Sequence, residues 1–302
     1  MTVRSLSRET APGPSGFDGG LVHILKYNEV FLDFLCDLCK RFANGSLCLQ
    51  RLFTASRLVP LLKNNSGDIR PIAVGEVLYR ICSTVLVRVV SFTLLSFQFG
   101  VRTPGGVESI IYLVALKARN RSIVSVDIQN AYNSIRRDFI LEAVIKREPA
   151  LLRAFTWSYG NHSSLFTLDA EEVILASGVK QGDPLSPLLF SLGYSQILSK
   201  LSKKLEDNGY QEDFHGVAYL DDTYFFPKPD HATRLLKLVE SLFTTYLSTQ
   251  ALNKSLRRRG IGLYFLSVTA GIAFGSSQRK SYKFLRSLSR FLPLPCTTEK
   301  VL

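Results

Sequence analysis

Two adjacent carboxylates, Asp221 and Asp222, lie within a run of apolar and aromatic residues at 216–226. This pattern predicts a β-hairpin whose turn carries the acidic pair. Two like charges side by side in apolar surroundings repel each other and lose hydration, and both effects cost free energy. A bound divalent cation would remove both costs, because hard cations prefer carboxylate oxygens. A solvated Asp-Asp turn is the alternative interpretation for a pair seen in isolation.

A third carboxylate, Asp127, favours the interpretation as a cation site over that of a solvated turn. It ends a short β-branched segment, 122–127, which predicts a strand. A carboxylate at a strand end and an Asp-Asp hairpin together supply the three ligands of a two-metal phosphoryl-transfer site. In such a site two cations ~4 Å apart clamp the attacking and leaving oxygens. The sequence contains no HExxH motif, Ser-His-Asp signature or P-loop that would favour a different chemistry.

The elements that must position these carboxylates follow from the hydrophobic periodicity. Helices are expected at 22–42, 76–97, 186–205 and from 231 to about 249, extended segments at 57–74 and 122–127, and a hairpin at 216–226. A polar turn at 64–68 interrupts the first extended segment. Strands that alternate with helices, together with a hairpin, indicate the α+β class, with a sheet packed on helices.

The charge balance indicates the kind of partner. Lys and Arg number 37 and Asp and Glu 25 among 302 residues, which gives a net charge of +12 and a pI near 9.5. A protein this basic suits a polyanion, either nucleic acid or an anionic membrane surface. Arg80 and Arg88 interrupt the most apolar stretch, 77–101, so insertion into a membrane is disfavoured. Five cysteines, an odd number, argue against a disulfide framework and for a reducing, intracellular compartment.

Several motifs, in order along the chain, resemble those of reverse transcriptases, particularly the enzymes of non-LTR retrotransposons. The first catalytic motif of that family is similar to VSVDIQNAYNS (124–134), its second palm motif to GVKQGDPLSP (178–187), and its metal-binding box to YLDD (219–222). Its fingers segments resemble LVPLLK (58–63) and IRPIAV (69–74). The resemblance implies a right-hand polymerase core of fingers and palm, with an antiparallel palm sheet packed on helices.

The resemblance also implies a role for each matching carboxylate. Asp127, Asp221 and Asp222 would be catalytic and would hold two Mg²⁺ ions, or Mn²⁺ in their place. The backbone carbonyl of Ile128 would assist as a further metal ligand.

Further roles implied by the resemblance concern the incoming nucleotide. Lys63 and Arg70 fall where the family grips the triphosphate, and Arg suits fork-like phosphate contacts. Tyr132 matches the aromatic residue that stacks under the deoxyribose and excludes a 2′-hydroxyl. Gln181 and Gly182 match the loop that lies against the nucleotide and template. For each residue alone a structural role stays open: solvated hairpin charges, a core tyrosine and a loop cap.

The function implied is that of an RNA-directed DNA polymerase that extends a DNA primer on an RNA template with dNTPs, in the nucleus of its host. The chain would divide into a flexible segment (1–20), fingers and connecting helices (21–120), a palm (121–250) and a basic C-terminal segment (251–302). The last segment departs from the family, because Leu256 occupies the position of an expected lysine. It would be a partial or degenerate thumb-side region, or a contact for the template–primer backbone. Two alternatives stay open: an inactive retrotransposon fragment that binds nucleic acid, and an RNA-templated RNA polymerase.

Overall fold

The computed structural model describes residues 3, 5–62, 69–118, 121–128, 130–211, 216–246 and 262–266; the side chains of Asp127, Thr244, Tyr246 and 262–266 lie outside this description. The chain divides into two compact units, each built from several segments. Unit 1 comprises Met1–Ser96, Ile128–Leu201 and Ser241–Gly260, and unit 2 comprises Phe97–Asp127, Ser202–Glu240 and Ile261–Leu302. The division into four regions expected from the sequence stays a prediction.

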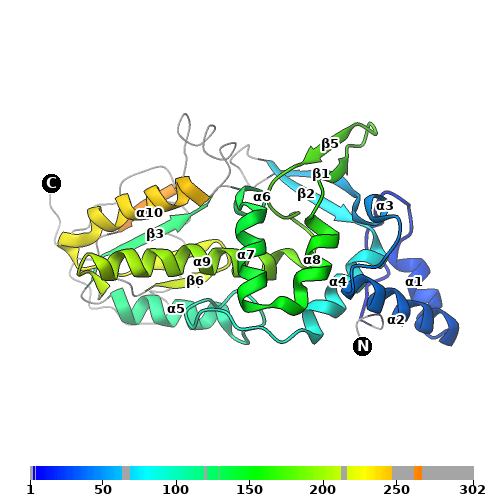
Figure 1. The fold of residues 1–302 in the computed structure, drawn as a ribbon, viewed down its shortest axis with the longest axis horizontal. Helices are drawn as coiled ribbons and strands as arrows, with labels where there is room; N and C mark the ends of the chain where they lie inside the picture. Colours follow the sequence, from blue (N-terminus) through cyan, green and yellow to red (C-terminus); the bar gives the residue numbers. More distant parts are fainter. Residues whose placement is uncertain are drawn as a thin grey trace, which may run out of the picture. The chain divides into compact units, whose positions relative to one another are not determined.

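Unit 1 is mainly helical (Figure 1). Its helices are α1 (Gly19–Leu25), α2 (Glu29–Ala43), α3 (Gln50–Thr54), α4 (Val77–Val89), α6 (Ala131–Ser134), α7 (Arg137–Arg147), the 3-10 turn η2 (Pro149–Leu151), α8 (Leu152–Tyr159) and most of α9 (Ser186–Asp207). Aromatic side chains join three of them. The ring of Phe42 on α2 meets Tyr79 on α4 and Trp157 on α8 edge-on, with centroids 5.6 and 5.5 Å apart. Such contacts fix the angles between helices as well as burying area.

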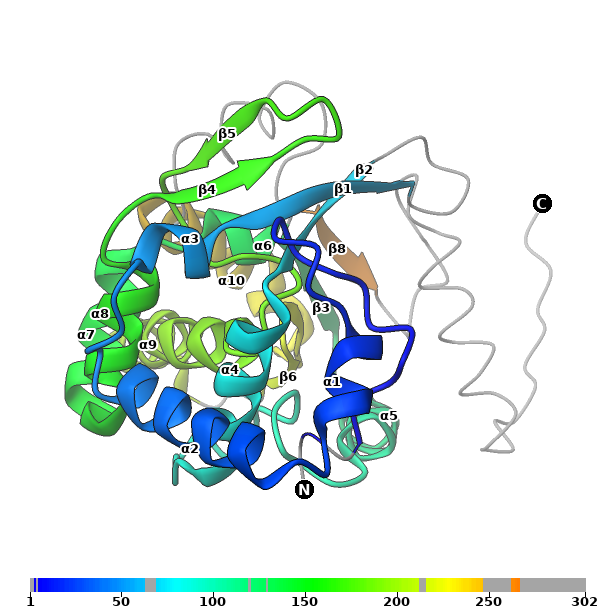
Figure 2. The same ribbon diagram turned by 90° about the vertical axis from the view of Figure 1, so that its right-hand side faces the viewer.

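The sheet of unit 1 has the strand order β2-β1-β4-β5. Strands β1 (Ser56–Leu62) and β2 (Ile69–Gly75) form an antiparallel hairpin from Ser56↔Gly75 to Leu62↔Ile69. Strand β4 (Ser163–Phe166) runs parallel to β1 and pairs with β5 (Glu172–Leu175), as Figure 2 shows. The β1–β2 hairpin is buried near its base and exposed toward its tip, so it projects from the helices that hold it.

Unit 2 contains an antiparallel sheet with the order β6-β7-β3-β8. Its strands are β6 (Val217–Tyr219), β7 (Asp222–Phe225), β3 (Ile123–Asp127) and β8 (Gly262–Leu266). Helix α5 (Gly106–Lys117) runs alongside β6 in Figure 1 and buries Ile110 and Val114 against Ile123, Val217 and Phe226. The strand ends are therefore anchored by one apolar cluster.

Most expected elements are confirmed. The extended segment at 57–74, the strand at 122–127, the hairpin at 216–226 and the helix at 186–205 correspond to β1–β2, β3, β6–β7 and α9. The polar turn expected at 64–68 lies outside the described residues. The helix expected from 231 is α10 (Ala232–Tyr246), and the part of that expectation beyond residue 246 lies outside the described residues. At the level of class, the mixture of helices and sheets confirms α+β.

Two helix boundaries were wrong. The helix expected at 22–42 is two helices, because the Asn28 side chain accepts a hydrogen bond from the Phe31 N–H (2.9 Å) and starts α2 afresh. The helix expected at 76–97 ends at Val89, and Val90 is extended. Beyond it the Thr93 N–H donates to the carboxylate of Glu148 (2.9 Å), which replaces a helical partner.

The N-terminal stretch 1–20 makes defined contacts where it is described. The Ser15 backbone N–H and hydroxyl donate to the two carboxylate oxygens of Glu76, at 2.8 and 2.6 Å. Its flexibility stays a prediction. No described helix combines the length and the hydropathy that a membrane span requires.

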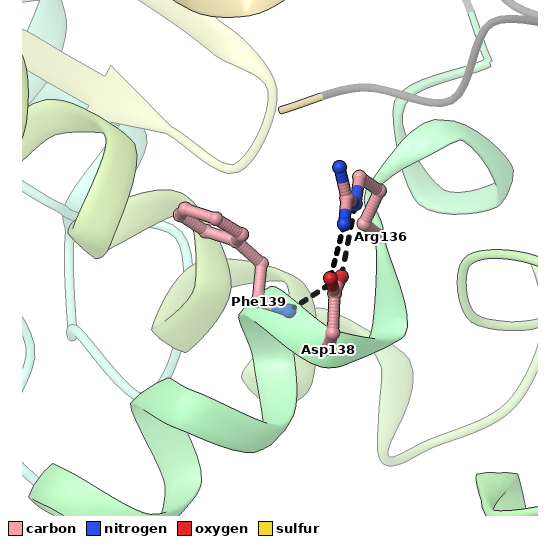
Figure 3. A network of polar contacts seen from close by, with 3 residues as sticks. All are labelled: Arg136, Asp138 and Phe139. Atoms are coloured by element: carbon pink, nitrogen blue, oxygen red, sulfur yellow. Dashed lines mark hydrogen bonds and ion pairs between the residues drawn. The ribbon is translucent and has the colours of Figure 1, made fainter. Parts of the chain in front are cut away.

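The start of α7 is fixed by a local polar network (Figure 3). The Asp138 carboxylate accepts hydrogen bonds from the Phe139 N–H (3.0 Å) and from Arg136 Nε (3.0 Å). The hydrogen bond from Arg136 is the main cause that lowers the pKa of Asp138. An acidic residue in the first turn accepts a hydrogen bond from an otherwise unpaired backbone N–H, and its negative charge interacts favourably with the positive end of the helix dipole. The network sets where the chain turns after α6, the short helix that carries Tyr132.

Candidate active site

The two adjacent aspartates lie at the turn between β6 and β7. Tyr219 pairs with Asp222, so Leu220 and Asp221 form a two-residue turn. Leu220 has a φ of 56°, a left-handed conformation that costs a non-glycine residue roughly 1–3 kcal/mol. Asp221 is half-buried and Asp222 is exposed. The turn therefore holds one carboxylate beside the sheet and the other toward solvent, at some cost in backbone strain.

The pairing of β3 with β7 brings the third aspartate to the same end of the sheet. The register runs Val124↔Phe225, Ser125↔Tyr224 and Val126↔Thr223. Continued by one residue, it sets the backbone of Asp127 opposite Asp222, and Cα atoms paired in this way lie about 5 Å apart. Val126 and Thr223 are both buried, so a slip of one residue would turn core side chains outward. The side chain of Asp127 lies outside the described residues.

Gly100 supports the turn and escaped the sequence prediction. The Phe99 N–H donates to the carbonyl of Ala218, and the Ala218 N–H donates to the carbonyl of Phe97, each at 2.8 Å. These bonds bring Gly100 so close to the turn that a Cβ there would lie 2.6 Å from the backbone nitrogen of Leu220. Only a glycine fits without moving the turn. An isolated glycine in an extended stretch is the one signal in the sequence that could have indicated such an approach.

Gln181 and Gly182 lie against strand β2 within unit 1. The Ala73 N–H donates to the carbonyl of Gln181 at 2.7 Å. Gly182 has a φ of +117°, and a Cβ there would lie 2.7 Å from the carbonyl oxygen of Ala73. Both the backbone conformation and the space require glycine. The strand that carries Arg70 and the loop predicted to face the nucleotide are therefore in direct contact.

Tyr132 belongs to the same assembly. Its carbonyl accepts a hydrogen bond from the Val179 N–H (2.7 Å), and its half-buried ring lies with its centroid 5.0 Å from that of Phe190 on α9. The structure thus brings Tyr132 together with the start of the 178–187 motif.

The remaining predicted residues have simpler placements. Arg70 is exposed on β2, opposite Leu61. Ile128 is buried directly after β3. Lys63 lies outside the described residues.

The carboxylate oxygens of Asp221 and Asp222 are suitable ligands for a hard divalent cation, because neither side chain is fully buried and the two residues are adjacent in the sequence. Among the described side chains, no three His, Cys, Asp or Glu groups converge as metal ligands would. The Asp127 side chain lies outside that set. Carboxylate oxygens fit Mg²⁺ or Mn²⁺ on their chemistry, and β3, which pairs with β7, ends at Asp127.

Two buried charged residues of the 178–187 motif were also missed. Lys180 is 1% exposed and Asp183 is 5% exposed, on either side of Gln181 and Gly182. Burial is the main cause that lowers the pKa of Lys180 to about 8, and the charge of Asp183 partly offsets it. A lysine beside a glycine turn ordinarily indicates a solvated charge, so no local pattern indicated this burial.

Unit 2 thus carries aspartates at the ends of antiparallel strands, and in unit 1 a glycine-containing loop packs on strand β2. The model of the family described as reverse transcriptase (RNA-dependent DNA polymerase) matches residues 61–285. The chain belongs to this family.

Relatives with curated names indicate the branch of the family. The chain is 27% identical to the "Retrotransposable element SLACS 132 kDa protein" of Trypanosoma brucei gambiense, over 98% of this chain and 24% of that protein. It is 29% identical to the "Retrovirus-related Pol polyprotein from type-1 retrotransposable element R2" of Popillia japonica, over 32% of this chain and 16% of that protein. A "Reverse transcriptase-like protein" of Chlamydomonas reinhardtii is 26% identical over 58% of this chain and 49% of that protein.

These matches confirm the predicted resemblance: the chain is a reverse transcriptase domain of the non-LTR retrotransposon type. It spans about a quarter of the length of the trypanosome relative and less than half of the algal one.

Replacing Gly182 by alanine tests the approach of the loop to β2. The new Cβ would both strain the backbone and collide with the Ala73 carbonyl, so we expect the free energy of unfolding to fall by about 2–4 kcal/mol. Gly209→Ala is the matched control, because Gly209 also has a positive φ (74°) but has no atom within 4 Å of the position that a Cβ would take. We expect a loss of about 1 kcal/mol there. The free energies of unfolding are measured with urea. Equal losses in Gly182→Ala and Gly209→Ala would contradict the close contact of Gly182 with the Ala73 carbonyl.

The lowered pKa of Lys180 leads us to expect a specific dependence of stability on pH. Its pKa is lower in the folded chain (about 8) than the ordinary 10.5, so between these values the unfolded chain binds more protons. The free energy of unfolding of the wild type should therefore rise with pH through this window, relative to Lys180→Met, by up to ~1.4 kcal/mol per pH unit. Urea titrations of both proteins from pH 7 to pH 9.5 measure the difference. A difference that is flat or falls with pH would show that the ammonium is not desolvated.

Proposed function

We propose that the chain catalyses RNA-templated DNA synthesis. The 3′-hydroxyl oxygen of a DNA primer would form a bond to the α-phosphorus of a dNTP, while the bond from that phosphorus to the departing pyrophosphate breaks and the hydroxyl proton passes to water. The observation that supports the proposal is the register of β3 with β7, which runs to Val126↔Thr223 and, continued by one residue, would set Asp127 opposite Asp222 beside the turn that also holds Asp221. On this proposal the β6-β7-β3-β8 sheet is the palm and the β1–β2 hairpin belongs to the fingers.

Asp127, Asp221 and Asp222 would hold two divalent cations, Mg²⁺ or Mn²⁺, with the Ile128 carbonyl as a further ligand. Bound cations supply Lewis acidity and neutralise charge that develops on the phosphate oxygens. The protein's own contribution is to hold the carboxylates rigidly. The buried pair Val126 and Thr223 below them, and the two-residue turn beside them, support that role.

We assign the grip on the nucleotide to Tyr132, Gln181 and Gly182, together with Arg70 and Lys63. The exposed guanidinium of Arg70 suits a phosphate, which it can contact with two parallel N–H donors. The backbone of Gly182, which has no side chain to shield it, can approach a base or sugar closely. The half-buried ring of Tyr132, supported by Phe190, offers a rigid surface beneath the sugar.

The partners proposed are an RNA template, a DNA primer and dNTPs, and we place the reaction in the nucleus. The net charge of +12 supports a polyanionic partner, because phosphates that the protein neutralises release their counterions. Binding to template–primer should therefore weaken as salt rises.

Removal of a single carboxylate charge at the hairpin tests the metal assignment. We expect Asp222→Asn to reduce single-nucleotide incorporation on an RNA template with Mg²⁺ by at least ~100-fold, because an amide is a much poorer ligand for a hard cation. The matched control is Asp230→Asn, at an exposed position on the 3-10 turn η4 (Pro229–His231), which should incorporate at the wild-type rate. Incorporation by Asp222→Asn at the wild-type rate would contradict the assignment.

Sugar selection provides a second, independent test. If the Tyr132 ring excludes a 2′-hydroxyl, Tyr132→Val should lower the preference for dNTPs over NTPs by about tenfold or more, whereas Tyr132→Phe should keep it. The measurement is the ratio of kcat/KM for dCTP and CTP on the same primer and template. An unchanged ratio in Tyr132→Val would remove the steric role. A wild type that prefers NTPs would favour an RNA-templated RNA polymerase.

A further inference from the structure

Two oppositely charged side chains flank Gln181 and Gly182 and point into the core of unit 1. The Lys180 ammonium donates to the backbone carbonyl of Thr54, at the end of α3, at 2.8 Å. Asp183 accepts through one carboxylate oxygen from the Leu185 N–H (2.9 Å) and through the other from Tyr79 and Tyr159. The dipeptide Gln181-Gly182 therefore lies between two residues whose side chains are held by hydrogen bonds.

The same two tyrosines contact both charged side chains, Lys180 and Asp183. The Tyr79 hydroxyl donates to Asp183 at 2.7 Å, and the Tyr159 hydroxyl donates to the same oxygen. The Lys180 ammonium lies over their rings, 4.6 Å from the centroid of Tyr79 and 5.6 Å from that of Tyr159. Burial first, and then the charge of Asp183, raise the pKa of both phenols. Both hydroxyls therefore stay protonated and remain donors to the carboxylate.

Arg137 holds the preceding part of the loop. Its guanidinium donates to the carbonyls of Gly178 (2.8 Å), Tyr159 (3.0 Å), Asn161 (2.6 Å) and Leu175 (3.0 Å). One side chain at the start of α7 thus joins β5, the end of α8 and the first residue of the 178–187 motif. The backbone path into Lys180 is fixed before the buried charges are reached.

Such a network is a costly way to fill a core. Burying two charges carries a desolvation penalty that apolar side chains of similar volume avoid, and a well-packed apolar replacement is often neutral or stabilising. What a buried polar network of this kind provides is a single backbone geometry, because each hydrogen bond accepts only a narrow range of positions. The geometry fixed here is that of the dipeptide lying on β2, where the Ala73 N–H meets the Gln181 carbonyl.

We propose that Lys180 and Asp183 are positioning residues that hold Gln181 and Gly182 at a fixed height on β2 and thereby set the affinity of the chain for the incoming nucleotide. This inference rests on the proposed function. Neither side chain contacts the nucleotide; both act through the backbone between them. Their loss should weaken dNTP binding while leaving the chemical step nearly intact.

The test combines steady-state kinetics with hydrogen exchange on the full chain. For Lys180→Met we expect the KM for dNTP to rise about tenfold with kcat within ~3-fold of the wild type, since the binding that is lost is the same in the ground state and the transition state. Tyr79→Phe, which deletes one hydroxyl at constant volume, should raise the KM about 3-fold and keeps the test valid if Lys180→Met does not fold. In both variants the backbone amide of Ala73, measured without nucleotide, should exchange faster.

Lys26→Met is the matched control, because Lys26 is also buried in unit 1 but its ammonium contacts His23 (3.1 Å) at the end of α1. It should change neither the KM for dNTP nor the exchange of Ala73. An unchanged KM in both Lys180→Met and Tyr79→Phe would overturn the inference, as would an equal rise in Lys26→Met. A wild-type chain that incorporates no nucleotide would contradict the proposed function instead. Exchange at Ala73 would then decide alone: faster exchange in both variants supports positioning, and unchanged exchange overturns it.

Discussion

Strands β3 and β7 pair antiparallel through Val124↔Phe225 and Val126↔Thr223, and the proposed chemistry depends on that register. The two strands come from distant parts of the chain, so the backbone of Asp127 comes to the end of the sheet that holds Asp222 only because the strands pair in this register. The side chains of Val126 and Thr223 are buried, and a shift by one residue would expose them while moving Asp127 away from Asp222. The core beneath the sheet thus fixes the backbone register on which the proposed site depends.

A similar dependence of site on core holds in unit 1. Gly182 must be a glycine because the Ala73 carbonyl leaves no space for a Cβ. The loop stays in that close approach because Lys180 and Asp183 are bonded into the interior on either side. In unit 2 Gly100 has the same relation to the turn at Leu220. In both places close backbone approach, rather than a long side chain, shapes the candidate site.

The parts predicted from the sequence are those with a local pattern. The β-branched run that ends at Asp127, the alternation around Asp221 and Asp222, and the apolar periodicity of α9 all depend on neighbours within one element. The matches to the reverse transcriptase family confirm the class of function that these motifs indicated. The roles assigned to single residues, Lys63 among them, stay predictions.

The parts that could not be predicted depend on contacts between residues far apart in sequence. Lys180 is buried because Thr54, Tyr79 and Tyr159 surround it, and nothing near it in the chain indicates those partners. The apolar periodicity continues across residues 26–28, so it concealed the cap at Asn28 that divides α1 from α2. The hydrogen bond from the Thr93 N–H to Glu148 joins residues 55 positions apart, so no local sequence pattern could predict it either.

In the proposed site the carboxylates of β3 and of the β6–β7 turn hold metal ions jointly. Electron paramagnetic resonance of Mn²⁺ bound to the full chain, with template–primer and dNTP present, measures this property. We expect about two ions bound per wild-type chain. Asp127→Asn and Asp222→Asn should each weaken binding of the same ions, although the substitutions lie on different strands. Equal binding by the wild type and either variant would show that the aspartates do not share the ions.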